Sequence, residues 1–241
     1  MIELLISRLK KILPDTIFNF FRRILTALIT PMLFSYKSGH FLSSIQSKAV
    51  DKKKNPIPWY TYSCIDFLQT FNFKNKKILE FGSGQSSIWW SKLSQEVHSL
   101  EDNDYYEKKI SKLKISNLKI YNCDTYLNNL DKLNFEKNFF DIIVVDGFDR
   151  FLSFKKSLDL ISKTGIFIFD NSEGYNEPRD NYKSHPILNM MSEQGFQRID
   201  FYGYAPGVIK KHCTSIFHKQ TSFINQLNLN DALDLNHKNQ K

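Results

Sequence analysis

A glycine-containing turn that directly follows a short apolar segment is the feature that most constrains the fold of this chain. The residues are Ile78-Leu79-Glu80-Phe81-Gly82-Ser83-Gly84-Gln85-Ser86-Ser87. In open α/β sheets, ligands bind outside the carboxyl ends of the strands, where glycines allow a tight turn and a close approach of the backbone. The stretch therefore predicts a strand, a turn and a helix of a doubly wound α/β sheet, with a ligand bound at the turn.

The charge beside this turn discriminates between nucleotide-like ligands. Glu80 would repel the pyrophosphate of a dinucleotide, whereas S-adenosylmethionine (SAM) has no phosphate and carries an ammonium and a sulfonium that a carboxylate attracts. Ser87 only approximates the small third residue of the dinucleotide fingerprint. We expect SAM first and a dinucleotide second, and the alternative without a ligand is an ordinary strand-to-helix turn.

Four further β-compatible segments end in acidic or amide residues. Residues 96–100 precede Glu101-Asp102, 118–121 precede Asp124-Thr125, 140–145 precede Asp146-Gly147, and 165–169 precede Asp170-Asn171. Because the carboxyl ends of parallel strands meet at one edge of a sheet, we expect these side chains to gather there. Glu101 follows the glycines by roughly 20 residues, the distance at which such folds place an acid on the ribose hydroxyls. Asp124 is the candidate acceptor for an adenine amino group.

With these motifs, the chain resembles the class I SAM-dependent methyltransferases over residues 59–219. The resemblance rests on Glu80-Phe81-Gly82-Ser83-Gly84, Glu101, Asp124, Val144-Val145-Asp146-Gly147 and Gly165-Ile166-Phe167-Ile168-Phe169-Asp170-Asn171. It implies a Rossmann-like, doubly wound α/β fold with a seven-stranded sheet, mostly parallel with an antiparallel last strand. Residues 197–202 and 213–217 would form the final pair of strands.

The same resemblance implies the contacts to SAM. The turn from Gly82 to Gln85 would line the methionine end, Glu101 the ribose and Asp124 the adenine. The predicted cofactor-binding residues are Glu80, Gly82, Ser83, Gly84, Gln85, Ser86, Glu101, Asp102, Asp124, Thr125 and Asp146. The chain departs from the family at Gln85-Ser86-Ser87, where many members carry a further glycine.

Methyl transfer to a hydroxyl requires alignment of the acceptor with the methyl group and removal of a proton. One solution is Mg²⁺ held by Asp146, Asp170 and Asn171, which are similar in order to the ligands of the catechol and caffeoyl-CoA O-methyltransferases. The metal-free solution uses His185 as the base and Asp146 to orient the substrate. The sequence has no metal-binding histidine motif, nucleophile elbow or phosphate-binding lysine loop. Its three widely separated cysteines fit a reducing compartment.

The positive charge of the chain is concentrated in residues 1–54, which carry +7 of the net charge of +8. A nucleic-acid groove across the catalytic domain is therefore not expected. We divide the chain into a basic helical appendage (1–54), a methyltransferase domain (55–220) and a polar tail (221–241). At the domain boundary, we expect Trp59 to pack in the core, whereas Tyr60 and Tyr62 could equally stack on a substrate.

The appendage has two predicted helices. Ile2, Leu5, Leu9 and Ile12 recur at helical spacing among basic residues, and a more apolar stretch over residues 17–34 is interrupted by Arg22-Arg23 and closed by Pro31. Its charge-free run, 24–36, is shorter than the roughly 20 residues of a membrane-spanning helix, and no secretory signal is recognisable. The appendage either lies in a membrane interface or packs on the catalytic domain or a dimer partner.

The sequence thus predicts a SAM-dependent methyltransferase on the cytoplasmic side, acting on an oxygen of a small or membrane-associated acceptor such as a saccharide or a lipid-linked intermediate. Two alternatives stay open. One is a nucleotide-dependent oxidoreductase or epimerase with a Rossmann fold, and the other is a non-catalytic membrane-surface scaffold that retains the fold.

Overall fold

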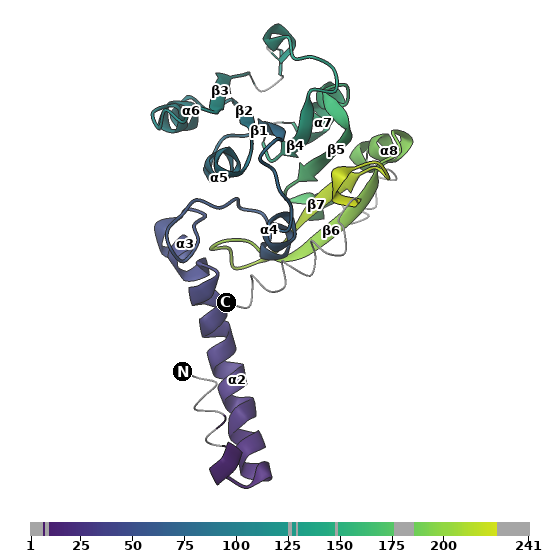
Figure 1. The fold of residues 1–241 in the computed structure, drawn as a ribbon. Coiled ribbons are helices and arrows are strands. Elements are labelled where there is room, and N and C mark those ends of the chain that lie inside the picture. Colours follow the sequence, from purple (N-terminus) through teal and green to yellow (C-terminus); the bar gives the residue numbers. More distant parts are fainter. Residues whose placement is uncertain are drawn as a thin grey trace.

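The computed structural model describes residues 7, 10–124, 127–128, 130–147, 149–175 and 186–225. A single sheet with helices on both faces forms the body of the protein, and one long helix projects from it (Figure 1). Most of the predicted helix over residues 2–12, and most of the predicted tail, lie outside the described residues.

The sheet has seven strands in the order β3-β2-β1-β4-β5-β7-β6. Strands β1 to β5 pair in parallel, and β7 is antiparallel to both of its neighbours, which confirms the predicted fold class. The strand order reverses between β1 and β4, so the ends of these two strands border the crevice in which such sheets bind ligands. The strands are β1 (Lys77–Phe81), β2 (Glu96–Glu101), β3 (Leu118–Asn122), β4 (Phe140–Val145), β5 (Ile161–Phe169), β6 (Gln197–Tyr204) and β7 (Lys211–His218).

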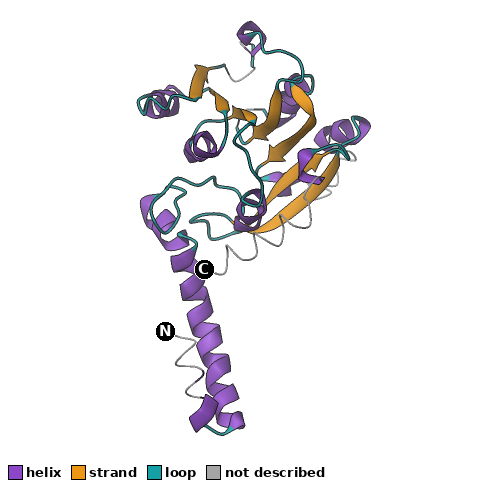
Figure 2. Ribbon diagram, viewed as in Figure 1, coloured by secondary structure: helices purple, strands orange, loops and turns teal. Residues whose placement is uncertain are grey.

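Helices cover the two faces of the sheet, and each face has its own apolar core (Figure 2). Residues of β4 alternate between the cores, since Ile142 and Val144 belong to one and Ile143 and Val145 to the other. This double burial explains the continuous apolar run that the sequence shows there. The described helices and 3₁₀ turns of this domain are α4 (Tyr62–Leu68), α5 (Gln85–Leu93), α6 (Asp104–Ser111), η1 (Leu130–Leu133), α7 (Arg150–Ser157), η2 (Ser172–Tyr175), α8 (Pro186–Glu193) and η3 (Phe223–Asn225).

The projecting helix is α2 (Asp15–Lys37), and it continues through Pro31, where the sequence predicted its end. Proline removes one backbone N–H donor, and the carbonyl that loses this bond belongs to Ala27, which is exposed to solvent. Water can satisfy that carbonyl, so the helix tolerates the proline. Beyond Pro31, the ring of Phe34 packs edge-on against Tyr62 with 5.4 Å between centroids, which anchors α2 to the domain.

A short helix, α3 (His40–Gln46), follows α2 and contacts the loop between β6 and β7. The N–H of Gly207 donates to Nδ1 of His40 (3.2 Å), and a Cβ atom at Gly207 would lie 2.7 Å from the backbone of Ser43. A side chain at this position would clash with α3, and the φ of +72° lies in the left-handed region that favours glycine, so both reasons call for glycine here. The loop and α3 are therefore fixed to each other.

Candidate functional site

The carboxyl ends of β1, β2, β4 and β5 bring Glu80, Glu101, Asp146 and Asp170 to one edge of the sheet, as the sequence predicted. Gln85 and Ser86 begin α5, and Asp102 directly follows β2. Asp124 follows the edge strand β3 in a turn, where its backbone carbonyl accepts from the N–H of Leu127 (2.8 Å). Thr125 and His185 lie outside the described residues.

The glycine turn requires glycine at its first position for two reasons. Gly82 has a φ of +101°, and a Cβ atom there would lie 3.2 Å from the backbone nitrogen of Gly147. The N–H groups of Asp146 and Gly147 both donate to the carbonyl of Phe81 (3.1 and 2.8 Å). These hydrogen bonds and the close approach of Gly82 to Gly147 hold the ends of β1 and β4 together.

Glu80 is completely buried below this turn. Its Oε2 accepts hydrogen bonds from the hydroxyls of Ser87 and Ser99, whereas its Oε1 has no hydrogen-bond partner among the described residues. Burial raises the pKa of Glu80 to about 7, although the serine hydroxyls act in the opposite direction. A buried carboxylate with a free oxygen favours a cation, and the ammonium of SAM is a cation of suitable kind.

Glu101 closes the other side of the turn. Its Oε2 accepts from the N–H of Ser83 (2.7 Å) and its Oε1 from the N–H of Asn103 (3.0 Å). Burial raises the pKa of this carboxyl as well. Each carboxylate oxygen can accept a further hydrogen bond, so Glu101 is oriented by the backbone and can still bind vicinal hydroxyls.

A cavity of about 210 Å³ opens beside the glycine turn, at the ends of β4 and β5. It is lined by Trp59, Asp146, Asp170, Asn171, Ala205, Val208 and His212. The predicted metal-binding trio of Asp146, Asp170 and Asn171 is thus brought together on its wall. The part of the chain that the structure describes contains no group of three or more His, Cys, Asp or Glu side chains that could hold a metal ion. The trio supplies two carboxylates and one amide.

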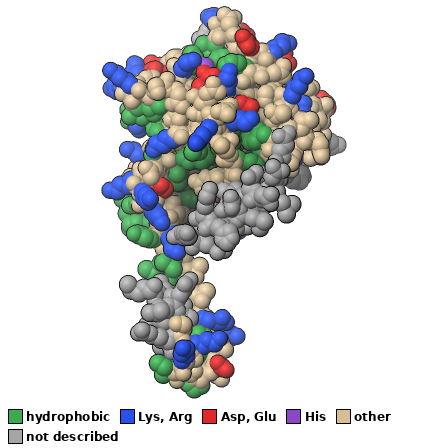
Figure 3. Space-filling model, viewed as in Figure 1, with side chains coloured by type: hydrophobic (Ala, Val, Ile, Leu, Met, Phe, Trp, Pro, Cys, Tyr) green, Lys and Arg blue, Asp and Glu red, His purple; other side chains and the backbone are tan. Residues whose placement is uncertain are grey.

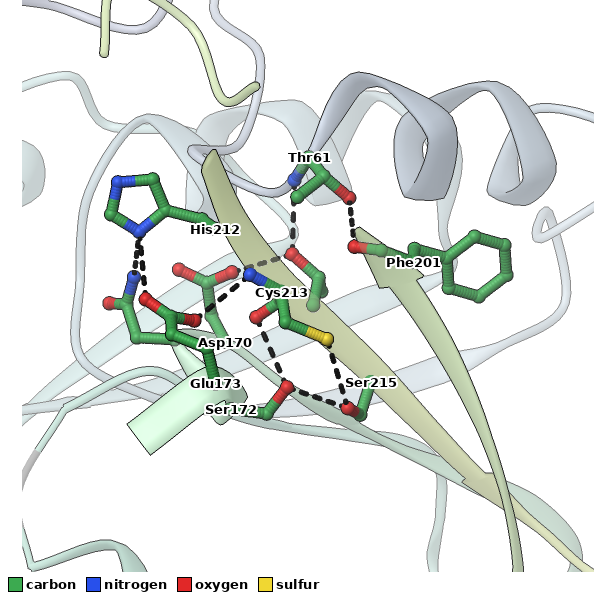
Figure 4. A network of polar contacts seen from close by, with 10 residues as sticks. Thr61, Asp170, Ser172, Glu173, Phe201, His212, Cys213 and Ser215 are labelled. Atoms are coloured by element: carbon green, nitrogen blue, oxygen red, sulfur yellow. Dashed lines mark hydrogen bonds and ion pairs between the residues drawn. The ribbon is translucent and has the colours of Figure 1, made fainter. Parts of the chain in front are cut away.

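The second wall of the cavity carries His212, which belongs to β7 (Figure 4). Its Nδ1 lies 3.0 Å from Oε1 of Glu173 and 3.1 Å from the side-chain amide of Asn171. An ionised carboxylate can only accept, so the contact with Glu173 assigns the proton to Nδ1. The atom of Asn171 that faces Nδ1 is Nδ2, which is itself a donor and does not accept this proton. The other ring nitrogen, Nε2, is buried and has no partner among the described residues.

Glu173 is itself held in place, because its Oε2 accepts from the N–H of Cys213 (2.9 Å). Asn171 adopts a φ of +52°, an uncommon conformation for a residue other than glycine. The side chains of Glu173, Asn171 and His212 thus form a polar group at one end of the cavity, and the backbone N–H of Cys213 connects this group to β7. A neutral imidazole with its Nδ1 proton bound to a carboxylate presents the lone pair of Nε2, which is the arrangement of a general base.

The two carboxylates of the cavity perturb each other. Burial, and then the charge of Asp146, raise the pKa of Asp170, whose Oδ1 accepts from the hydroxyl of Thr214 (2.7 Å). Burial also raises the pKa of Asp146, whereas the guanidinium of Arg150 lowers it. Perturbed carboxyl groups in a cavity next to a ligand turn are typical of functional sites.

The sequence predicts no role in the site for His212, Glu173 or Trp59. His212 and Glu173 belong to no local motif, and only the strand order brings them together. Trp59 was expected in the core, but it is 47% exposed and its Nε1–H donates to the carbonyl of Pro206 (2.9 Å). Tyr60 takes the core position in its place and accepts from Nε1 of Trp90 (3.2 Å). The expectation for Trp59 is therefore wrong, and Tyr60 takes the core-packing alternative of the two that the sequence left open.

Comparisons with known proteins agree with the fold. No protein-family model and no curated protein matches the sequence. Among solved structures, the chain is similar to precorrin-6y C5,15-methyltransferase from Geobacter metallireducens, with a TM-score of 0.51 and 14% identity over 73% of this chain and 96% of the other. It is also similar to a protein assigned as a caffeoyl-CoA O-methyltransferase from Staphylococcus aureus (TM-score 0.49, 15% identity, 83% and 99% covered). The chain has the class I methyltransferase fold.

Proposed function

We propose that this protein is a SAM-dependent methyltransferase that methylates a hydroxyl oxygen of a small acceptor. The observation that carries the proposal is the buried Oε1 of Glu80, which has no hydrogen-bond partner in the part of the chain that the structure describes and lies below a glycine turn in this fold. The carboxylate of Glu80 favours a cationic ligand at the place where such sheets bind their ligands, and its negative charge disfavours a pyrophosphate. The class I methyltransferase fold independently supports SAM as that ligand.

In the proposed complex, the turn from Gly82 to Gln85 and Glu80 hold the methionine part of SAM, and Glu101 binds the ribose hydroxyls. Asp124 is proposed to meet the adenine, with Ser86, Asp102, Thr125 and Asp146 contributing to the same site. SAM supplies an electrophilic methyl group on a good leaving group. The protein then needs only to align the acceptor and remove its proton.

We assign proton removal to His212. The methyl group moves from the sulfonium to the acceptor oxygen, and the hydroxyl proton moves to Nε2 of His212. The imidazolium that results is stabilised by Glu173, which already accepts the proton of Nδ1. The earlier candidates were His185, which the structure does not describe, and Asp146, which lines the cavity and is proposed to orient the acceptor.

The cavity indicates the class of acceptor. At about 210 Å³ it is smaller than the roughly 300–1,000 Å³ of pockets for drug-sized ligands, so it suits a single ring or the reacting end of a longer molecule. Asp146 and Asp170 on its wall disfavour an anionic group, and the indole of Trp59 offers an apolar face. We propose a neutral saccharide hydroxyl, either free or lipid-linked, in the cytoplasm or at the cytoplasmic membrane face.

Mg²⁺ is the second candidate for activating the hydroxyl, because Asp146, Asp170 and Asn171 share one wall of the cavity. Such an ion would lower the pKa of a bound hydroxyl. We favour the base, because His212 lines the same cavity and its Nε2 has no hydrogen-bond partner among the described residues. Chelation separates the two possibilities.

Titration calorimetry with SAM, S-adenosylhomocysteine and NAD(P) tests the proposal. We expect binding of the first two ligands, no binding of NAD(P), and loss of SAM affinity in Glu80→Gln. Binding of NAD(P) without SAM would overturn the proposal in favour of an oxidoreductase or epimerase. SAM binding without methyl transfer to any saccharide or lipid-linked acceptor would favour a scaffold that retains the fold.

A further inference from the structure

Helix α2 exposes an unusual amount of apolar surface. Only Phe18 of its 23 residues is buried. The large apolar side chains that face solvent are Ile17, Phe20, Phe21, Ile24, Leu25, Leu28, Met32 and Phe34, with exposed fractions that reach 63% at Leu28 and 72% at Met32. A contiguous apolar surface of this kind marks a site of interaction with a protein or a membrane.

The apolar and polar residues of α2 lie on opposite faces. Successive residues of an α-helix are about 100° apart, which places Ile17, Phe20, Phe21, Ile24, Leu25, Leu28 and Met32 on one broad face. The opposite face carries Asp15, Asn19, Arg22, Arg23, Thr26, Thr30 and Lys37. Figure 3 shows basic side chains beside apolar ones at the far end of this helix.

The position of the two arginines distinguishes a helix that crosses a membrane from one that lies on it. Among the described residues, α2 is long and apolar enough to span a bilayer. A spanning orientation, however, would place Arg22 and Arg23 well inside the helix and leave a charge-free run from 24 to 36, shorter than the roughly 20 residues required. An orientation parallel to the surface directs both arginines and Lys37 toward the headgroups.

We propose that α2 lies in the interface of a membrane that contains anionic lipids, with its apolar face in the acyl region and its basic face at the headgroups. The partner follows from charge complementarity, because Arg22, Arg23 and Lys37 stand against Asp15 alone on the polar face. In a second copy of the chain, α2 carries the same basic face, which would repel this one.

Exposed apolar side chains continue beyond α2 toward the cavity. Phe41 and Ile45 of α3 and Ile209 of the β6–β7 loop are exposed, the last by 88%. The neighbours of Ile209 in this loop, Ala205 and Val208, line the cavity itself. A membrane-bound α2 would thus hold the rim of the cavity near the lipid, and this consequence for a lipid-linked acceptor rests on the proposed function.

Vesicle binding by the full-length protein tests the proposal. We expect sedimentation with phosphatidylcholine vesicles that contain phosphatidylglycerol, weaker binding as salt is raised, and release by alkaline carbonate. In Arg22→Ala/Arg23→Ala, binding to the anionic vesicles should fall roughly fivefold for each cation removed, with little change on pure phosphatidylcholine.

Two matched double variants locate the lipid-facing side. Phe21→Gln/Leu28→Gln changes the apolar face, and Thr26→Gln/Thr30→Gln makes similar changes on the polar face. We expect the first to weaken binding to vesicles by at least about tenfold and the second to change it by less than about twofold. All four side chains are exposed, so circular dichroism and SAM affinity should stay unchanged in both variants.

Three outcomes would overturn the proposal. Absence of vesicle binding at low salt excludes a membrane partner. Equal losses in both double variants, or resistance to carbonate extraction, indicate a helix that is surrounded by lipid on all sides. A lipid-free dimer that Phe21→Gln/Leu28→Gln dissociates, from a protein that ignores vesicles, assigns the face to a second copy. None of these readouts depends on methyl transfer, so failure here is distinct from failure of the proposed function.

Discussion

The proposed cofactor half of the site is built locally, whereas the proposed acceptor half is assembled from segments far apart in the chain. Glu80 belongs to β1, the glycine turn follows this strand, and Glu101 ends the next strand, β2. Backbone N–H groups donate to the carboxylate of Glu101 and fix its orientation. The acceptor cavity draws on Trp59 before the sheet, Asp146 and Asp170 after β4 and β5, and His212 on β7. A local segment can specify the first half, but only the complete strand order specifies the second.

The difference teaches where variation is tolerated. The glycine turn tolerates few substitutions, because Gly82 and Gly147 approach each other closely and Glu80 is completely buried. The cavity is lined partly by loop residues such as Ala205 and Val208, whose replacement would change its shape without disturbing the strands. We therefore expect acceptor specificity to change more readily than cofactor specificity.

Replacement of His212 should have the largest effect on methyl transfer, and it tests whether the proposed acceptor half can be changed without the proposed cofactor half. His212→Ala removes the proposed base and should lower the rate of methyl transfer by about 10²–10⁴-fold, the usual contribution of general base catalysis, while SAM affinity stays unchanged. The measurement is transfer of labelled methyl groups from SAM to saccharide and lipid-linked acceptors.

A matched variant controls for a structural role of His212. In Glu173→Gln the imidazole remains, but the carboxylate that holds its Nδ1 proton is lost. Nitrogen-15 NMR should show the Nδ1–H tautomer of His212 in the parent protein and a shift toward Nε2–H in the variant. An Nε2–H tautomer in the parent protein would contradict the assignment of the base.

Replacement of Glu101 tests the cofactor half alone. Glu101→Ala removes charge-assisted hydrogen bonds to the ribose and should cost about 2–4 kcal/mol of SAM affinity. Calorimetry with SAM and S-adenosylhomocysteine measures this loss, and Asp104→Ala, at an exposed position of α6 outside the proposed site, is the comparison variant. Unchanged affinity in Glu101→Ala would remove the ribose assignment.

We expect Glu80 to lower the stability of the folded protein at neutral pH while it supports the binding of SAM. Its folded-state pKa of about 7 exceeds the ordinary value of 4.5, so the folded protein retains a proton that the unfolded chain loses. The stability contributed by this proton is present below pH 4.5 and is lost as the pH rises to about 7, a difference of roughly 3 kcal/mol.

Glu80→Gln removes this dependence. Without ligand at slightly alkaline pH, we expect the variant to be more stable than the parent protein by up to about 3 kcal/mol, although it binds SAM poorly. Urea unfolding at several pH values provides the measurement. A variant that is less stable than the parent at every pH would show that the carboxylate is needed for the fold rather than for the ligand.

Chelation should have the smallest effect. If His212 is the base, exhaustive treatment with EDTA leaves methyl transfer unchanged, and added Mg²⁺ does not increase it. Loss of activity on chelation and its recovery with Mg²⁺ would transfer hydroxyl activation to Asp146, Asp170 and Asn171. In that case the acceptor half would depend on a second cofactor.

The extent of prediction from sequence follows the same division. The strands and their acidic ends were predictable, because successive apolar runs that end in Glu80, Glu101, Asp146 and Asp170 are typical of parallel strands whose carboxyl ends face a ligand. His212 was not predictable as a site residue, since its partner Glu173 is 39 residues earlier and the contact exists only because β7 lies beside β5. Trp59 was misplaced because large aromatic residues are usually buried, and neighbouring Tyr60 is equally compatible with the core.

The position of β7 also has a consequence for the order in which the protein matures. This strand lies between β5 and β6, so β6 has no partner in the sheet until β7 has been synthesised. A nascent chain can complete the glycine turn and its neighbouring strands well before it contains His212. A chain that ends after Tyr204 contains the glycine turn but lacks His212, so we expect methyl transfer to become feasible only once β7 is complete.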